Sequence, residues 1–191
     1  MLEGRFFMQA LKDSIDDYLH FIKVERQLSD NTLQSYKRDL IAYARHIHYE
    51  QHINAFHEAV REHILLYLES LRTAGKSSKT ISRQISSIRS FHQFLLREKV
   101  TDQDPTVHLE MPKKEQSLPK VLSVEEIEDL IAAPSIEKPQ GVRDIAILEI
   151  MYGSGMRISE LIELNLEDIH ITMGFVRVFG KGGKERIIPL G

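Results

Sequence analysis

Two stretches near the end of the sequence hold the residues best suited to chemistry. In the first, residues 152–161 (YGSGMRISEL), a glycine turn places Arg157 in the first turn of a predicted helix. A guanidinium held by a helix can stabilise a pentacovalent phosphate through bidentate hydrogen bonds to its oxygens, and Glu160 can orient it. The alternative is a surface Arg–Glu pair of little energetic value. These residues alone leave both interpretations open.

The second stretch, residues 176–191 (VRVFGKGGKERIIPLG), alternates apolar and polar residues on both sides of two glycines. The pattern predicts a β-hairpin whose turn carries Lys181 and Lys184. It does not fit a P-loop, because glycine follows Lys181 where that motif needs Ser or Thr. It does not fit a dinucleotide-binding fingerprint, because the turn joins two strands and the third glycine is missing.

No metal site is predicted. Five histidines are crowded into residues 46–63 without an HExxH motif, and they are interpreted as solvated surface residues. They are His46, His48, His52, His57 and His63. Glu163, Glu167 and Asp168 also cluster, but Asp168 is typical of a turn residue. A carboxylate pair for two-metal catalysis therefore gains little support.

Composition limits the class of protein. The chain has 191 residues, enough for one large domain or two small ones, and its 42% hydrophobic and 28% charged residues are typical of a globular protein. It contains no cysteine, which excludes disulfides and thiolate chemistry. No apolar run approaches the length of a membrane span, so we expect a cytoplasmic protein without a membrane partner.

The charge is unevenly distributed. The net charge is −3, yet residues 72–99 hold seven Lys and Arg residues against one acidic residue, Glu98. Such a basic block inside an acidic protein is a candidate phosphate-binding surface. A solvated helix face explains the same block, and charge alone does not separate the two interpretations.

Helical periodicity runs through the first hundred residues and predicts a small antiparallel four-helix bundle. The expected helices cover about 11–22, 33–47, 58–72 and 77–97. Residues 1–7 precede a second methionine, Met8, and carry no weight in this prediction. The apolar positions expected inside the third and fourth helices are Ile64, Leu65, Leu68, Leu71, Ile81, Ile85, Ile88, Phe91, Phe94 and Leu95. The opposite face of the fourth helix, with Lys79, Arg83 and Gln84, suits phosphate oxygens and groove edges, or water.

A change of pattern after Asp104 predicts a second unit. Prolines at 105, 112 and 119 indicate an extended linker, and Ser123 with Glu126 forms a capping box before an apolar run. Two further helices, about 141–152 and 157–164, precede the hairpin. The predicted fold is mainly α, with domains at 9–104 and 121–191 and a linker at 105–120. The second domain is expected to be the incomplete start of an α+β domain.

The sequence resembles the tyrosine site-specific recombinases, and most closely the bacterial Xer type, with its XerD-like branch before its XerC-like branch. The stretches that carry the resemblance are LSDNTLQSYKRDL (28–40), KTISRQISSIRSFHQFLLRE (79–98), DPT (104–106), LPKVLSVEEIEDLI (118–131), RDIAILEIMYGSGMRISELIELNLEDI (143–169) and GFVRVFGKGGKERIIPLG (174–191). The combination of a glycine-turn arginine with a GKGGKER hairpin is specific to this family.

The resemblance implies a four-helix, SAM-like core-binding domain followed by a catalytic domain, the two closing around DNA. Arg157 then stabilises the phosphorane transition state, and Lys181 is the general acid for the departing 5′ oxygen. The implied DNA contacts are Thr32, Lys37, Lys79, Thr80, Arg83, Ser87, Arg89 and Lys184. No metal or other cofactor is implied, because cationic side chains neutralise the charge.

The rest of the family's catalytic set does not map onto this sequence. It comprises a His-x-x-Arg pair, a later His or Trp and the nucleophilic tyrosine. All six tyrosines precede Arg157. The expectation is a chain that ends inside its catalytic domain, binds DNA weakly and does not cleave it alone.

At full length the resemblance implies site-specific DNA recombination through a 3′-phosphotyrosine, which resolves chromosome dimers during cell division. The implied partners are double-stranded DNA, a second Xer-type recombinase in a tetramer and a DNA translocase of the division septum. Two alternatives stay open. One is a non-catalytic DNA-binding or regulatory module, and the other is an unrelated helical interaction protein.

Overall fold

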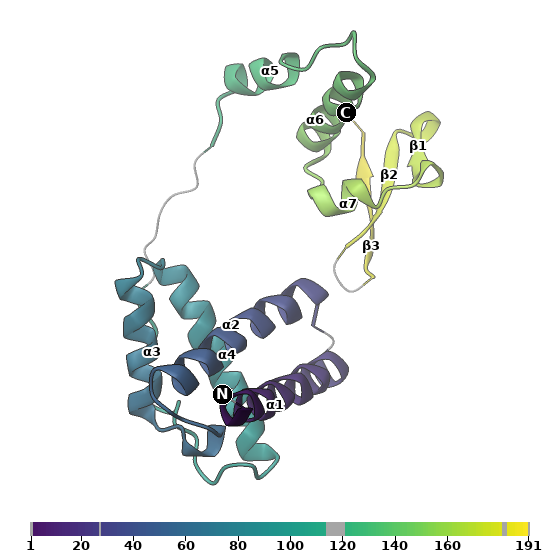
Figure 1. Ribbon diagram of the computed structural model, residues 1–191. Helices are drawn as coiled ribbons and strands as arrows, with labels where there is room; N and C mark the ends of the chain where they lie inside the picture. Colours follow the sequence, from purple (N-terminus) through teal and green to yellow (C-terminus); the bar gives the residue numbers. More distant parts are fainter. Residues whose placement is uncertain (1, 27, 114–120, 181–182, 191) are drawn as a thin grey trace. The chain divides into compact units, whose positions relative to one another are not determined.

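The computed structural model describes residues 2–26, 28–113, 121–180 and 183–190, and the side chains from Phe7 onward within these ranges. The chain divides into two compact units, Met1–Ser117 and Leu118–Gly191. Figure 1 shows a helical first unit, and a second unit in which short helices accompany a small sheet.

The first unit is the predicted four-helix domain. Its elements are α1 (Leu2–Arg26), α2 (Asp30–Tyr49), the 3-10 turn η1 (Phe56–Glu58), α3 (Arg61–Thr73) and α4 (Ser78–Arg97). Ser77 caps α4 by accepting a hydrogen bond from the Thr80 amide at 3.2 Å. Two boundaries differ from the prediction. Helix α1 already begins at Leu2, and η1 delays the start of α3 to Arg61.

The core of this unit joins all four helices. Tyr18, Tyr43 and Phe91 are fully buried at its centre, and the rings of Tyr18 and Phe91 meet edge to face at 5.4 Å between centroids. The predicted apolar stripe of α4 is confirmed, with Phe94 only partly buried. Two placements were wrong: Leu65 is 43% exposed, whereas Gln84, predicted on the polar face, is buried.

Buried polar side chains in the first unit pair with one another. The Tyr67 hydroxyl of α3 donates a hydrogen bond to Gln84 Oε1 of α4 at 2.5 Å, which explains why Gln84 can lie inside. The Tyr43 hydroxyl lies 3.1 Å from His92 Nε2, and both residues are fully buried. These two pairs tie α4 to α3 and to α2.

The second unit begins with the predicted capping box, which is confirmed. Ser123 Oγ accepts a hydrogen bond from the Glu126 amide at 3.2 Å, and the Ser123 amide donates to Glu126 Oε2 at 2.8 Å. This box starts α5 (Val124–Ala132), which is followed by α6 (Pro139–Ser154), α7 (Ile158–Ile162) and the 3-10 turn η2 (Leu166–Asp168).

A three-stranded antiparallel sheet completes the second unit, in the order β1-β2-β3. Strands β2 (Phe175–Phe179) and β3 (Glu185–Pro189) form the predicted hairpin. Strand β1 (Ile169–His170) was not predicted, because two residues followed by the 3-10 turn η3 (Ile171–Met173) show no alternation. The buried core here is small: Met156, Val176, Val178 and Ile188.

Among the described residues, no helix combines the length and apolarity that crossing a bilayer would need.

The burial of His92 makes the stability of the first unit depend on pH. Desolvation lowers the pKa of His92 to about 4, although the charge of Asp104 acts to raise it. In the unfolded chain a histidine titrates near 6.5, so between these values the unfolded state binds more protons than the folded state. We therefore expect the unfolding free energy to fall as pH falls from about 6.5 to 4, by on the order of 3 kcal/mol from this group.

Urea unfolding followed by tyrosine fluorescence measures this effect, since five of the six tyrosines lie in the first unit and the chain has no tryptophan. The control is His92→Phe, which removes the titrating group and should flatten the dependence in this window. An equal pH dependence in both proteins would contradict the prediction.

Candidate active site and nucleic-acid interface

A buried carboxylate, Glu160, organises the candidate active site in the second unit. Its side chain is 4% exposed. Glu160 Oε1 accepts from Arg157 Nη1 at 2.9 Å, while Oε2 accepts from the Arg157 amide at 2.8 Å and from Arg186 Nη2 at 2.7 Å. Glu160 therefore holds the guanidinium of Arg157, as the spacing in the sequence suggested, and also its backbone amide, which was not predicted.

The glycine turn before Arg157 is built by backbone geometry. Helix α6 ends at Gly155, which adopts the left-handed conformation at φ 61°, where a side chain would be strained. Met156 then buries its side chain in the core and Arg157 becomes the N-cap residue of α7. The Arg157 side chain is 68% exposed, so its guanidinium is anchored through Nη1 while the side chain stays mostly open to solvent.

The second arginine at Glu160 comes from the sheet. In the β2–β3 register Arg186 faces Val178 and Ile188 faces Val176, so these side chains share one sheet face. The three apolar members of this set are buried, and Arg186 is 42% exposed. Sequence reasoning missed Arg186. The signal was available, because Arg186 and Ile188 are two residues apart on one strand and so point to the same face.

The base of the hairpin turn lies close to Glu160. A Cβ placed on Gly180 would come within 3.7 Å of Glu160 Oε1. The Gly180 amide donates to the Lys184 carbonyl at 2.7 Å, and Lys184 is exposed. Lys181, the predicted general acid, lies outside the described residues. The described part of the turn therefore begins beside the carboxylate that holds Arg157.

A second buried carboxylate supports the opposite face of the sheet. Asp168 Oδ1 accepts from Arg177 Nε and Nη2 at 3.0 and 2.9 Å, and its Oδ2 accepts from the Asn165 amide at 3.3 Å. Asp168 is therefore a turn residue, as interpreted from the sequence, and also an arginine anchor, which the sequence analysis missed.

Hydrogen bonds from arginine and backbone N–H groups lower the pKa of both carboxyl groups. For Glu160 the main cause is the Arg157 amide, followed by the side chain of Arg157 and the charge of Arg186. For Asp168 the main cause is the Arg177 side chain. Both carboxylates therefore stay ionised and hold their arginines at neutral pH.

The candidate nucleic-acid interface lies on α4 in the first unit. Lys79 is exposed, and Arg83, one turn later, is 42% exposed and paired with the buried Asp39 of α2. Thr80 is partly buried and its hydroxyl lies 3.0 Å from Ser77 Oγ at the helix cap. Arg89 Nη2 donates to the Leu109 carbonyl at 2.7 Å, so Arg89 holds the segment that follows α4.

The other predicted contacts lie in different surroundings. Ser87 is fully buried and its hydroxyl donates to the Gln84 carbonyl at 2.9 Å, so we do not carry it into the proposed interface. Lys37 is exposed and paired with Asp16 at 2.8 Å. Thr32 is partly buried, with its hydroxyl 2.9 Å from Ser29 Oγ.

The histidine cluster is only partly at the surface, which corrects the sequence interpretation. His48 is buried, with Nδ1 3.4 Å from the Ile53 carbonyl. His63 Nδ1 accepts from the Val60 amide at 3.1 Å, and the His46 ring lies 5.2 Å from that of Tyr67. Across the described ranges, no group of three or more His, Asp or Glu side chains is arranged to hold a metal ion.

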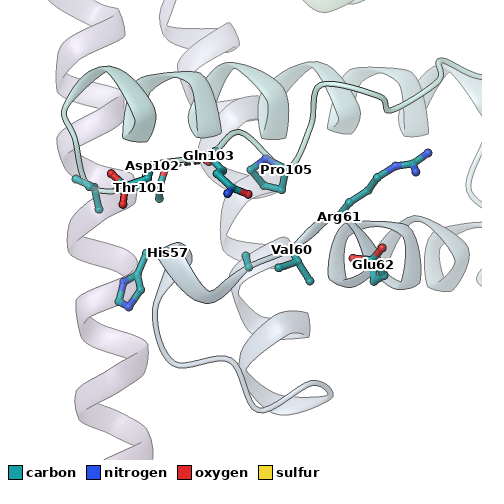
Figure 2. Close-up of a pocket in the computed structure, with 10 residues that line it drawn as sticks. His57, Val60, Arg61, Glu62, Thr101, Asp102, Gln103 and Pro105 are labelled. Carbon is teal, nitrogen blue, oxygen red and sulfur yellow. Dashed lines mark hydrogen bonds between the residues drawn. The ribbon is translucent and has the colours of Figure 1, made fainter.

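A cavity of about 570 Å³ lies in the first unit, between the segment before α3 and the segment after α4. Figure 2 shows the residues that line it. Its lining residues are His57, Ala59, Val60, Arg61, Glu62, Val100, Thr101, Asp102, Gln103 and Pro105. No predicted site residue is among them. The cavity borders the end of α4, whereas Lys79 and Arg83 lie in its first two turns.

Comparison with known proteins identifies the family. Residues 15–99 match the phage integrase N-terminal SAM-like domain, and residues 120–191 match the phage integrase family. The chain is 51% identical over 184 residues to the tyrosine recombinase XerD of Halalkalibacterium halodurans, covering 96% of this chain and 62% of that protein. The chain belongs to the phage integrase family of tyrosine recombinases.

A second XerD, from Oceanobacillus iheyensis, is 50% identical over 181 residues, covering 95% of this chain and 61% of that protein. This family member thus spans about 60% of the length of the curated relatives it matches.

Solved structures of tyrosine recombinases share the fold. A lambda integrase dimer bound to a COC′ core site superposes with a TM-score of 0.73 at 19% identity, over 94% of this chain and 48% of that one. XerH bound to a difH substrate, in a pre-cleavage complex, gives 0.69 at 17% identity, over 96% of this chain and 64% of that one.

Removing the Glu160 carboxylate should release Arg157. In Glu160→Ala the Arg157 amide loses its acceptor, so we expect its hydrogen exchange to speed up by about ten-fold or more, in line with the loss of a charge-assisted hydrogen bond. Amide exchange measured by NMR at neutral pH reports this directly. Glu167→Ala, which removes an exposed carboxylate nearby, is the matched control and should leave the Arg157 amide unchanged. Equal exchange in the two variants would contradict the role given to Glu160.

Proposed function

We propose that this chain comprises the core-binding domain and the first part of the catalytic domain of a site-specific DNA recombinase of the Xer type. The observation that carries the proposal is the identity of about 50% to XerD proteins over more than nine-tenths of the chain. The domains proposed from the sequence, 9–104 and 121–191 with a linker between them, take the DNA-binding and catalytic roles.

Arg157 is proposed as the arginine that stabilises the phosphorane, and Lys181 as the general acid for the 5′ oxygen. The geometry around Glu160 supports the first role, because Arg157 is anchored and still mostly open to solvent. An anchored guanidinium approaches a developing phosphorane with little reorganisation, which is the condition for electrostatic catalysis. The position of Gly180 beside Glu160 supports the second role, because it brings the start of the turn close to Arg157.

At full family length, the proposed activity is strand exchange through a 3′-phosphotyrosine, acting in the cytoplasm to resolve chromosome dimers at cell division. The proposed partners are duplex DNA carrying the recombination site, a second Xer-type recombinase in a tetramer, and a DNA translocase of the septum. Solved relatives are described as bound to DNA as a dimer and, on a Holliday junction, as a tetramer, which supports the first two partners.

The chain of 191 residues should bind duplex DNA in a salt-dependent manner. Lys79 and Arg83 expose cations on one face of α4, so raising salt from about 50 to 200 mM should weaken binding steeply. Lys79→Ala should weaken affinity several-fold and reduce the salt slope by about one contact. Fluorescence anisotropy with a labelled duplex of about 30 base pairs measures both.

Lys23→Ala provides the control for the binding experiment, because it removes an exposed lysine from the end of α1 that is not in the proposed interface. Binding that is absent, or insensitive to salt, would favour a helical interaction protein.

Strand cleavage should depend on Arg157. The test protein joins this chain to the segment of the Halalkalibacterium relative that follows the aligned region. In this protein, Arg157→Ala should reduce the amount of covalent adduct on a nicked suicide substrate by about 10²–10³-fold, while DNA binding is kept. The control is Arg143→Ala on α6, which removes an exposed arginine paired with its neighbour Asp144. Unchanged cleavage in Arg157→Ala, or loss of binding alone, would favour a non-catalytic DNA-binding module. The 191-residue chain by itself should form no adduct.

A further inference from the structure

Asp39 is a buried carboxylate that the proposed function has not used. It lies on α2 with its side chain 4% exposed, and it faces α4. Its Oδ2 accepts hydrogen bonds from Arg83 Nη1 and from Ser87 Oγ, the latter at 3.4 Å. Arg83 and Ser87 are one helical turn apart, so one carboxylate oxygen receives two donors from the same face of α4.

Stability does not account well for this arrangement. Removing a carboxylate from water costs several kcal/mol, and an ion pair with a half-exposed arginine recovers only part of that cost. The same two opposing effects act on the pKa of the Asp39 carboxyl. Desolvation raises this pKa, although Arg83 and Ser87 act to lower it. A packed apolar residue would often serve a purely structural role as well or better.

The ion pair with Asp39 has a clearer effect on the side chain of Arg83. One nitrogen of its guanidinium is fixed by Asp39, and the side chain stays 42% exposed. Within the described part of the chain Arg83 makes no other hydrogen bond, so the rest of its planar fork is available to a ligand. Fixing a long side chain beforehand lowers the rotamer entropy lost on binding, and a guanidinium suits bidentate contact with phosphate.

The helix that carries Arg83 is also held in place. Gln84, the next residue, accepts a hydrogen bond from the Tyr67 hydroxyl of α3. The single hydroxyl hydrogen of Ser87 is shared between the Gln84 carbonyl of its own helix at 2.9 Å and Asp39 Oδ2 at 3.4 Å. These contacts limit rotation of α4 about its axis. Arg83 lies on the same side of α4 as the exposed Lys79, because the two are four residues apart on one helix.

We propose that Asp39 is a positioning residue that holds the Arg83 guanidinium ready for a DNA phosphate, and that Ser87 assists by orienting the Asp39 carboxylate. This inference rests on the proposed function, because it assumes that the Lys79–Arg83 face of α4 binds DNA. It also gives Ser87 a role compatible with its burial, in place of the direct contact expected from the sequence.

A charge-removing substitution distinguishes positioning from simple electrostatics. Asp39→Asn removes a negative charge, so simple electrostatics predicts tighter binding to DNA. Positioning predicts the opposite, an affinity about five- to ten-fold weaker, because the neutral amide holds Arg83 less firmly. Asp30→Asn, at the exposed start of the same helix, is the matched control for charge and should bind equally or more tightly.

The experiment is a double-mutant cycle on the 191-residue chain. Binding to a labelled duplex of about 30 base pairs is measured over about 50 to 200 mM salt for the wild type, Asp39→Asn, Arg83→Gln and the double variant. Arg83→Gln should lower the salt slope by about one contact, and Asp39→Asn should then cause no further loss of affinity. Helix content by circular dichroism verifies that each variant is folded.

Each outcome has a distinct meaning. If the wild type binds and Arg83→Gln weakens binding, but Asp39→Asn binds as tightly as Asp30→Asn, the inference is overturned and the proposed function stands. Equal losses from Asp39→Asn with and without Arg83 overturn it as well, because they show a general structural effect. Absence of salt-dependent binding by the wild type overturns the proposed function itself.

If Asp39→Asn does not fold, Ser87→Ala replaces it in the cycle. The expected result is then about a two-fold loss of affinity, seen only when Arg83 is present.

Discussion

Burying a carboxylate is costly, and in this chain arginines that remain partly in water offset part of that cost. The same arrangement occurs at Asp39, Glu160 and Asp168, whose side chains are 4–8% exposed. Their arginine partners are 39–68% exposed. Each buried carboxylate thus holds at least one arginine whose side chain is partly exposed to solvent. The candidate interface on α4 and the candidate site at α7 both depend on this constraint.

The two units differ in how firmly they can support such pairs. The first unit has a large core with aromatic contacts among Tyr18, Tyr43 and Phe91, and Asp39 lies between helices that this core already fixes. Among its described residues, the second unit has four buried apolar side chains in its core. Hydrogen bonds through Glu160 and Asp168 therefore contribute a larger share of the order around α7 and the sheet.

Local signals in the sequence were sufficient for the longer elements, though not for β1, and for part of the site. Helical periodicity gave the four helices, Ser123 and Glu126 gave the start of α5, and alternation around two glycines gave the hairpin. Glu160 was found because it is three residues from Arg157. Asp39 was not found, because its partner Arg83 is distant in sequence and pairs with it only after folding. Arg177 and Arg186 were also missed, although the alternation of the hairpin places Arg186 on the same face as Ile188. The burial of Gln84 could not be predicted either, since it depends on a hydroxyl from another helix.

Strand β3 has a consequence for how the chain behaves in concentrated solution. Within the described residues it pairs only with β2, so its other edge can accept a strand from a second molecule. That edge is five residues long, it begins with Glu185 and Arg186, and it ends at Pro189, which has no N–H to donate. Charge at one end and proline at the other are features that discourage edge-to-edge association. Arg186 thus bonds to Glu160 and also contributes to the charge that protects the edge of β3 against aggregation.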